Sequence, residues 1–102
     1  MKIQAESVHF PIDTQLMSLI QQKVFRLKSF FHRINEARVI FTYEQSGQKQ
    51  EIVAEVKIHL PNGIIFIKER SKTFEAALGK ALVGLKVLLL RHKAKRLSYC
   101  HT

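Results

Sequence analysis

Lysine and arginine carry the chemistry that this sequence offers, because their positive charges bind phosphate. Seven of the seventeen Lys and Arg residues fall between residues 71 and 102, where Glu75 is the single acid. These seven are Lys72, Lys80, Lys86, Arg91, Lys93, Lys95 and Arg96. Cations clustered in this way neutralise phosphates and release the counterions that a nucleic acid condenses. The net charge of +9 and the pI of 10.1 favour a polyanionic partner over the alternative, cations that only complement a helix dipole.

A second group of cations lies on an earlier segment with helical periodicity. If the two basic helices lie side by side, their cations form two rows, which suit the backbone of a folded RNA better than a flat surface does. Phe66 and Tyr43 are isolated and do not form the aromatic motif of single-strand RNA modules, so we expect recognition of shape and phosphate. The candidate RNA-binding residues are Lys23, Arg26, Lys28, Arg33, Lys80, Lys86, Arg91, His92, Lys93, Lys95 and Arg96.

Catalytic residues and metal ligands form no recognisable constellation in the sequence. The five His residues are scattered, Cys100 is the only cysteine, and the eight acids are mostly isolated from one another. A zinc site needs several ligands at fixed spacing, and general acid–base catalysis needs a paired group. We therefore expect no enzymatic activity, no metal, no cofactor and no small-molecule substrate. His92 lies inside the basic cluster, where it either contacts RNA or packs at the end of a helix.

The length of 102 residues is typical of one domain, and a hydrophobic content of 46% supplies a small core. We expect the domain to span residues 1–96, followed by a short tail over 97–102. No apolar run reaches the roughly 18 residues that cross a membrane, and the N-terminus lacks the pattern of a signal peptide. A lone cysteine cannot form an internal disulfide, which fits a reducing compartment. These features predict a cytoplasmic protein that does not bind a membrane.

The elements that position these cations follow from the hydrophobic pattern. Residues 14–34 predict a helix, with Asp13 placed to cap it and Ile12 and Met17 at the positions of a hydrophobic staple. Its apolar side chains recur at steps of three and four, the spacing of one stripe. They are Leu16, Leu19, Ile20, Val24, Leu27, Phe31 and Ile34.

Four segments predict β-strands. They are residues 2–8, 37–44, 51–60 and 64–70. The third alternates most clearly, which indicates one buried face. Its apolar residues on that face are Ile52, Ala54, Val56, Ile58 and Leu60. Asn62-Gly63 predicts a hairpin between the third and fourth strands, because both residues tolerate positive φ.

A second apolar stripe predicts a long helix that begins after Thr73 and ends near Arg96. The stripe consists of Phe74, Ala77, Leu78, Ala81, Leu82, Leu85, Leu88 and Leu89. The order is β-α-β-β-β-α, and short turns favour an antiparallel meander for the last three strands. Neither helix can bury its stripe alone, so both are expected on the apolar face of one four-stranded sheet. The predicted class is α+β, with the shape of a double-stranded-RNA-binding domain.

The ordered motifs resemble the ribosome hibernation promoting factor family, which is also known as ribosome-associated inhibitor A or the sigma-modulation/ribosomal S30 family. The similar segments are residues 1–4, 16–31, 55–63, 76–78 and 91–95. Each motif is short, but their order and spacing together cover residues 1–96. The resemblance is to the short form of the family, for which we expect no C-terminal dimerisation domain after Thr102.

The resemblance implies a cytoplasmic stress-response factor of the stationary phase. Such factors bind rRNA of the small ribosomal subunit in the channel of messenger and transfer RNA, and they block translation by occupancy. In the family, basic residues of both helices contact rRNA, which corresponds to the two rows of cations described above.

The sequence departs from the family pattern around the second predicted helix. The family usually carries acids before and within this helix, where this sequence has Lys68, Arg70, Ser71, Lys72, Thr73 and Gly79. The middle of the second predicted helix is poor in charge, so Val87 and Leu90 leave apolar surface through which the protein could self-associate. Gly79 and Gly84 each cost about 1 kcal/mol relative to Ala in a helix interior and are either tolerated or needed for close packing. The alternatives to a hibernation factor are therefore a generic structured-RNA-binding module and a protein-interaction regulatory module.

Overall fold

The computed structural model describes residues 2–8, 11–30, 33–61 and 63–100, and the side chains of residues 30, 46 and 93–100 lie outside that description. Its elements are β1 (Lys2–Ser7), α1 (Thr14–Phe30), β2 (Glu36–Ser46), β3 (Lys49–Leu60), β4 (Gly63–Ser71) and α2 (Phe74–Cys100). The predicted β-α-β-β-β-α order is confirmed. The expectations for Phe31 and Asn62 fall on residues outside the described ranges.

The four strands form one sheet in the order β1-β2-β3-β4. β1 is parallel to β2, whereas β2, β3 and β4 pair antiparallel as the predicted meander. The register aligns Val39 with Val56 and Val56 with Ile67, so apolar side chains of adjacent strands share one face. Gly47 turns the chain between β2 and β3 at a φ of 64°, a value that glycine adopts without a steric cost.

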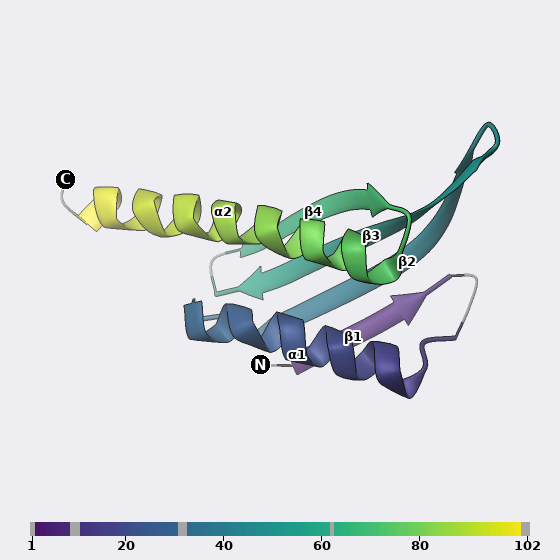
Figure 1. Ribbon diagram of the computed structural model, residues 1–102. Helices are drawn as coiled ribbons and strands as arrows, with labels where there is room; N and C mark the ends of the chain where they lie inside the picture. Colours follow the sequence, from purple (N-terminus) through teal and green to yellow (C-terminus); the bar gives the residue numbers. More distant parts are fainter. Residues whose placement is uncertain (1, 9–10, 31–32, 62, 101–102) are drawn as a thin grey trace.

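Both helices cover the same face of this sheet, as Figure 1 shows. The core between the two layers is formed by side chains of α1, α2 and the facing residues of the strands. Its fully buried members include Ile20, Val24, Val39, Phe41, Val56, Ile58, Leu78, Leu85 and Leu89. The predicted placement of both helices on one face is therefore confirmed, and the C-terminal part of α2 projects past the sheet.

The two predicted helix caps are present. The Leu16 backbone N–H donates to the Asp13 carboxylate at 2.7 Å, and the Ala76 N–H donates to the Thr73 hydroxyl at 3.1 Å. Each bond satisfies one of the backbone donors that the first turn of a helix leaves without a partner. The caps fix where α1 and α2 begin and hence which side chains face the sheet.

The helix ends differ from the sequence-based prediction. α1 ends at Phe30 rather than at residue 34, although Ile34 is buried as its apolar character suggested. The chain leaves the helix early because Asn35 already joins the sheet. Its backbone N–H donates to the His59 carbonyl, and its backbone carbonyl accepts from the Lys2 N–H. In contrast, α2 continues past Arg96 to Cys100, since no Gly or Pro interrupts residues 97–100.

Two glycines of α2 have different surroundings. A Cβ on Gly84 would collide with the Cδ1 atom of Ile67 on β4, so this glycine lets the helix approach the strand. A Cβ on Gly79 would meet no heavy atom within 4 Å. Close packing therefore explains Gly84, and nothing in the structure explains Gly79.

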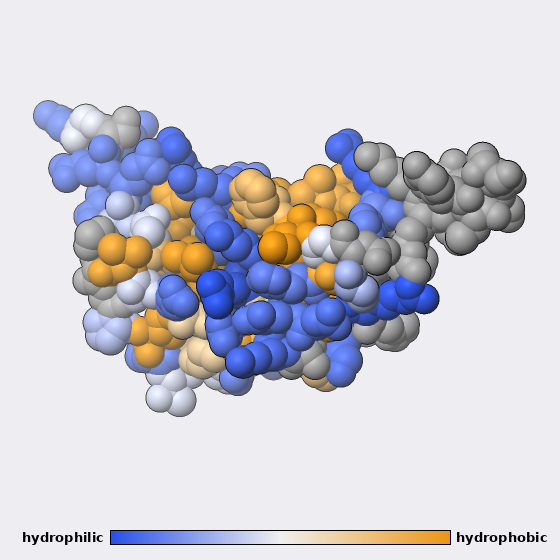
Figure 2. All heavy atoms as spheres, turned by 180° about the vertical axis from the view of Figure 1, so that it is seen from behind, coloured by the Kyte–Doolittle hydropathy of each residue, from blue (hydrophilic) through white to orange (hydrophobic). Residues whose placement is uncertain are grey.

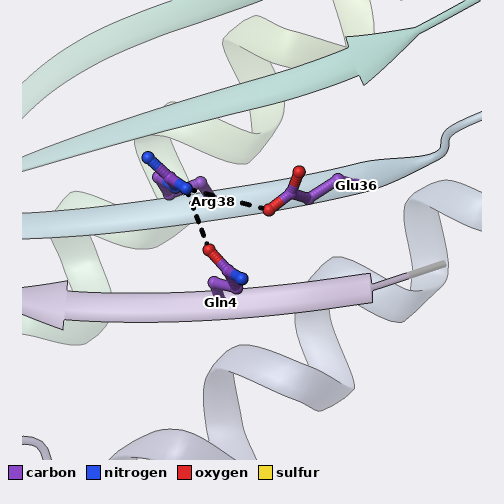
Figure 3. A network of polar contacts seen from close by, with 3 residues as sticks. All are labelled: Gln4, Glu36 and Arg38. Atoms are coloured by element: carbon purple, nitrogen blue, oxygen red, sulfur yellow. Dashed lines mark hydrogen bonds and ion pairs between the residues drawn. The ribbon is translucent and has the colours of Figure 1, made fainter.

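No helix of the described part of the chain covers the opposite face of the sheet. Arg38 on β2 lies between Gln4 of β1, whose side-chain oxygen accepts a hydrogen bond at 3.0 Å, and Glu36, which lies 4.0 Å away (Figure 3). Hydrophilic side chains dominate this face, with hydrophobic ones between them (Figure 2). Ile64 and Phe66 of β4 are exposed here, at 59% and 60%. We refer to this surface as the open sheet face.

Candidate nucleic-acid interface

A groove of about 580 Å³ lies between α1 and α2 on the helical side of the molecule. Its floor contains apolar side chains, and its rim contains Lys23 and Arg26 from α1 and Lys86 from α2. The lining residues are Lys23, Arg26, Leu27, Ser29, Gly79, Leu82, Val83 and Lys86, and none is acidic. We call this feature the interhelical groove.

The hydrophobic stripes of the helices explain why these cations converge. Lys23 directly precedes the buried Val24, and Lys86 directly follows the buried Leu85. A residue next to a buried position lies about 100° around the helix, at the boundary between core and solvent. When both stripes pack on one sheet, the boundaries of α1 and α2 face each other, and the cations on them line the same groove.

The other basic residues of α1 and the following turn lie outside the groove lining. The Lys28 ammonium lies 5.8 Å from the centre of the Phe25 ring, a cation–π contact. Phe25 itself lines a separate depression with Ile3 of β1. Arg33 is exposed in the turn after α1. The first expected row is thus divided between two flanks of the helix.

The second expected row is also divided. Lys80 donates to the Arg70 backbone carbonyl on β4 at 3.3 Å, on the flank of α2 that faces away from the groove. It lines a depression with Glu69 and Gly84. Arg91 is exposed, and His92 is half-buried. Lys93, Lys95 and Arg96 belong to α2, but their side chains lie outside the described part of the chain.

Two exposed apolar side chains near these cations were not predicted from the sequence. Phe25 on α1 is 60% exposed, and Val83 on α2 is 68% exposed and lines the groove. The sequence did hold a signal, because neither residue fits the apolar stripe of its helix. Exposure of Val87 and Leu90, which was expected from the same reasoning, is confirmed at 44% and 47%.

Within residues 2–8, 11–30, 33–61 and 63–100, no three His, Cys, Asp or Glu side chains gather where they could hold a metal ion. In the same part of the chain, neither helix combines the length and the apolar character needed to cross a bilayer. The interhelical groove brings Lys23, Arg26 and Lys86 together from two helices, and we take it as the candidate site.

The chain matches the family model of the sigma 54 modulation protein / S30EA ribosomal protein over residues 3–97. The chain belongs to this family. The resemblance to hibernation promoting factors that the sequence motifs suggested is thereby confirmed, and membership indicates a ribosome-associated protein. A search of curated proteins found no match.

Two solved structures share the fold of this S30EA-family protein. A ribosomal subunit interface protein from Coxiella burnetii superposes with a TM-score of 0.82 at 20% identity, covering 92% of this chain and 99% of that chain. The N-terminal domain of Protein Y from Thermus thermophilus gives a TM-score of 0.77 at 22% identity, covering 90% and 99%. At these identities the comparison establishes the common α+β architecture.

Proposed function

We propose that this protein is a cytoplasmic hibernation factor that binds rRNA of the small ribosomal subunit in the messenger and transfer RNA channel. It blocks translation by occupying that channel during stationary phase or stress. The observation that carries the proposal is the interhelical groove, where cations from both helices converge with no acid among the lining residues. Family membership supports the ribosome as the target.

The groove suits a phosphate backbone for two reasons. Arg26 and Lys86 project exposed side chains from opposite walls, so one strand of RNA can contact both. The nearest acids in the two helices lie at their first turns, where Asp13 caps α1 and Glu75 follows the Thr73 cap of α2. The middle of each helix therefore carries cations and no acid, a distribution that attracts a polyanion.

Occupancy is the proposed mechanism because it needs only binding. A protein that fills the channel excludes messenger and transfer RNA without making or breaking a bond. The remaining basic candidates contribute further phosphate contacts around the groove, and they are Lys28, Arg33, Lys80, Arg91, His92, Lys93, Lys95 and Arg96. Since each phosphate contact adds about one unit to the salt slope at most, affinity falls steeply with salt.

The direct test is co-sedimentation of the protein with purified small subunits, large subunits and whole ribosomes across a salt series. We expect binding to small subunits and whole ribosomes, weakening at high salt, and displacement by excess messenger with transfer RNA. Equal binding to isolated RNAs of many kinds would instead identify a generic structured-RNA-binding module. Binding to large subunits alone would refute the proposed site.

Translation output separates occupancy from turnover. When protein is titrated into a translation reaction, inhibition is expected to saturate near one protein per ribosome and to reverse after a high-salt wash. Complete inhibition far below that ratio would show that each protein inactivates many ribosomes, which occupancy cannot do.

A second candidate function follows from the exposed apolar residues of α2. Val83, Val87 and Leu90 lie at steps of four and three, so they form one ridge on the outer side of the helix. Such a ridge is a surface for self-association or for a regulatory protein partner. Sedimentation equilibrium tests self-association, which would persist at high salt and disappear in Val87→Glu. A monomer at all salt concentrations would remove self-association.

A further inference from the structure

Phe25 is an exposed aromatic ring in the middle of a basic helix. It is 60% exposed on α1, although an apolar side chain of this size is normally buried. It borders a depression of about 560 Å³ that is separate from the interhelical groove. The lining residues are Ile3, Ser18, Gln21, Gln22 and Phe25.

The residues around Phe25 have a common chemistry. Ser18, Gln21 and Gln22 lie seven, four and three residues before it, so they share its side of α1. They supply a hydroxyl and two amides, which both donate and accept hydrogen bonds. Lys28 lies three residues after it, with its ammonium 5.8 Å from the ring centre. No acid lines the depression, and α1 contains none from Thr14 to Phe30.

We propose that Phe25 stacks on one unpaired nucleobase of the bound RNA. The ring has Lys28 near one face and a largely exposed surface besides. The amides of Gln21 and Gln22 then hydrogen-bond the edge of the base, and Lys28 neutralises the phosphate attached to it. This site rests on the proposed RNA-binding function. It adds a stacking contact with a base to the electrostatic contacts with phosphates.

The surroundings favour a nucleotide over a protein side chain. A protein anchor site is usually an apolar patch, whereas this ring is surrounded by amides, a hydroxyl and a cation. Unpaired bases are recognised by stacking on aromatic rings together with hydrogen bonds to their edges. Arg26 follows Phe25 on the exposed side of the helix, so a strand that contacts the groove can also reach the depression.

The test compares two phenylalanines of equal exposure. Phe25→Ala is expected to weaken binding to small subunits about tenfold, the usual loss for one stacked base. Phe66→Ala on the open sheet face, where Phe66 is also 60% exposed, is expected to leave binding unchanged. Because stacking releases no counterions, Phe25→Ala retains the wild-type salt slope, whereas Lys28→Ala makes the slope shallower by about one.

Substitutions at Phe25 identify the kind of contact. Phe25→Tyr is expected to bind like the wild type, and Phe25→Leu like Phe25→Ala, because only an aromatic ring stacks. If Leu restored full binding, an apolar contact with a ribosomal protein would replace the base. If Ala bound like the wild type, the site would be abandoned.

A second arm separates this inference from the proposed function. The same variants are titrated against a short RNA stem-loop with and without a single bulged base. If the wild type fails to bind ribosomes, the proposed function is refuted. The stem-loop titration still tests whether Phe25 stacks on an unpaired base. Preference for the bulged RNA that disappears in Phe25→Ala supports the site, whereas equal affinity for both RNAs overturns it.

Discussion

The two surfaces of this protein carry their charge in opposite ways. On the open sheet face, five acids and six bases alternate along the strands, so their formal charges nearly cancel. The acids are Glu6, Glu36, Glu44, Glu51 and Glu55, and the bases are Lys2, Arg38, Lys49, Lys57, Lys68 and Arg70. In the helical layer, six bases with described side chains accompany the single acid Glu75. They are Lys23, Arg26, Lys28, Lys80, Lys86 and Arg91.

The difference separates a surface of balanced charge from a cationic one, and the cationic surface is the one that we propose to bind RNA. Three ion pairs lie on the open sheet face, and the Arg70–Glu44 pair at 3.0 Å joins β4 to β2. This pair passes over β3 beside Val53, which is buried although it points away from the helices. The charges of the open face thus nearly balance one another, whereas bases far outnumber acids in the helical layer.

The largest effect is expected from a substitution that separates the two layers. Leu85→Asp places a carboxylate at a fully buried position between α2 and the sheet. Because an unpaired buried charge costs several kcal/mol, the domain should unfold. Circular dichroism melting measures this, with Lys57→Asp on the open face as a control that should still fold. Native-like melting of Leu85→Asp would mean that the core has been misplaced.

A smaller effect concerns the contact of α2 with β4. Gly84→Ala should destabilise the fold by at most about 1 kcal/mol, because the added methyl group displaces the Cδ1 atom at the end of the half-buried Ile67 side chain. Gly79→Ala, in open space on the same helix, should stabilise it by up to about 1 kcal/mol through helix propensity. Urea unfolding of both variants measures the difference. Stabilisation by both substitutions would show that the helix does not approach the strand this closely.

Loss of a helix cap should have a smaller effect than the difference between the two glycine variants. Thr73→Ala removes the hydroxyl that accepts from Ala76 and should cost about 1 kcal/mol. Thr73→Ser keeps that hydroxyl and serves as the matched control in thermal melting. Equal stability of the two variants would show that the cap contributes nothing.

The smallest expected effect lies on the open sheet face. Arg70→Gln removes the ion pair with Glu44, in which both side chains are substantially exposed. Such surface pairs contribute at most about 1 kcal/mol, so the melting temperature should change little and ribosome binding should not change. A strong loss of ribosome binding would show that the balanced face also contacts the ribosome.

The sequence predicted the fold well because the fold depends on local periodicity. The alternation of Ile52 to Leu60 determined the buried face of β3, and Asp13 and Thr73 marked the helix starts correctly. The predicted end of α1 was wrong because Ile34 continues the helical spacing of apolar residues. Ile34 is buried, but it lies in the connection after the helix rather than in the helix itself. Local spacing cannot reveal that Asn35 already pairs with His59 of β3.

The site was predicted less completely because it depends on how the helices are rotated about their axes. The sequence placed Lys80, Lys86 and Arg91 on one helix, but it could not show that Lys86 alone among the described α2 cations lines the groove with Lys23 and Arg26. The exposure of Phe25 also depends on that rotation. Gly79 and Gly84 look alike in sequence, and only the proximity of Ile67 distinguishes them.

The most direct test of the central claim compares matched neutralisations on the two surfaces. Arg26→Gln with Lys86→Gln removes two charges from the groove, and Lys2→Gln with Lys68→Gln removes two exposed charges from the open sheet face. Binding to small ribosomal subunits is measured across a salt series for both double variants and the wild type. We expect the groove variant to lose about two units of salt slope and at least tenfold in affinity, while the open-face variant binds like the wild type. Equal losses in both variants would contradict the account, because the attraction would then depend on net charge rather than on the groove.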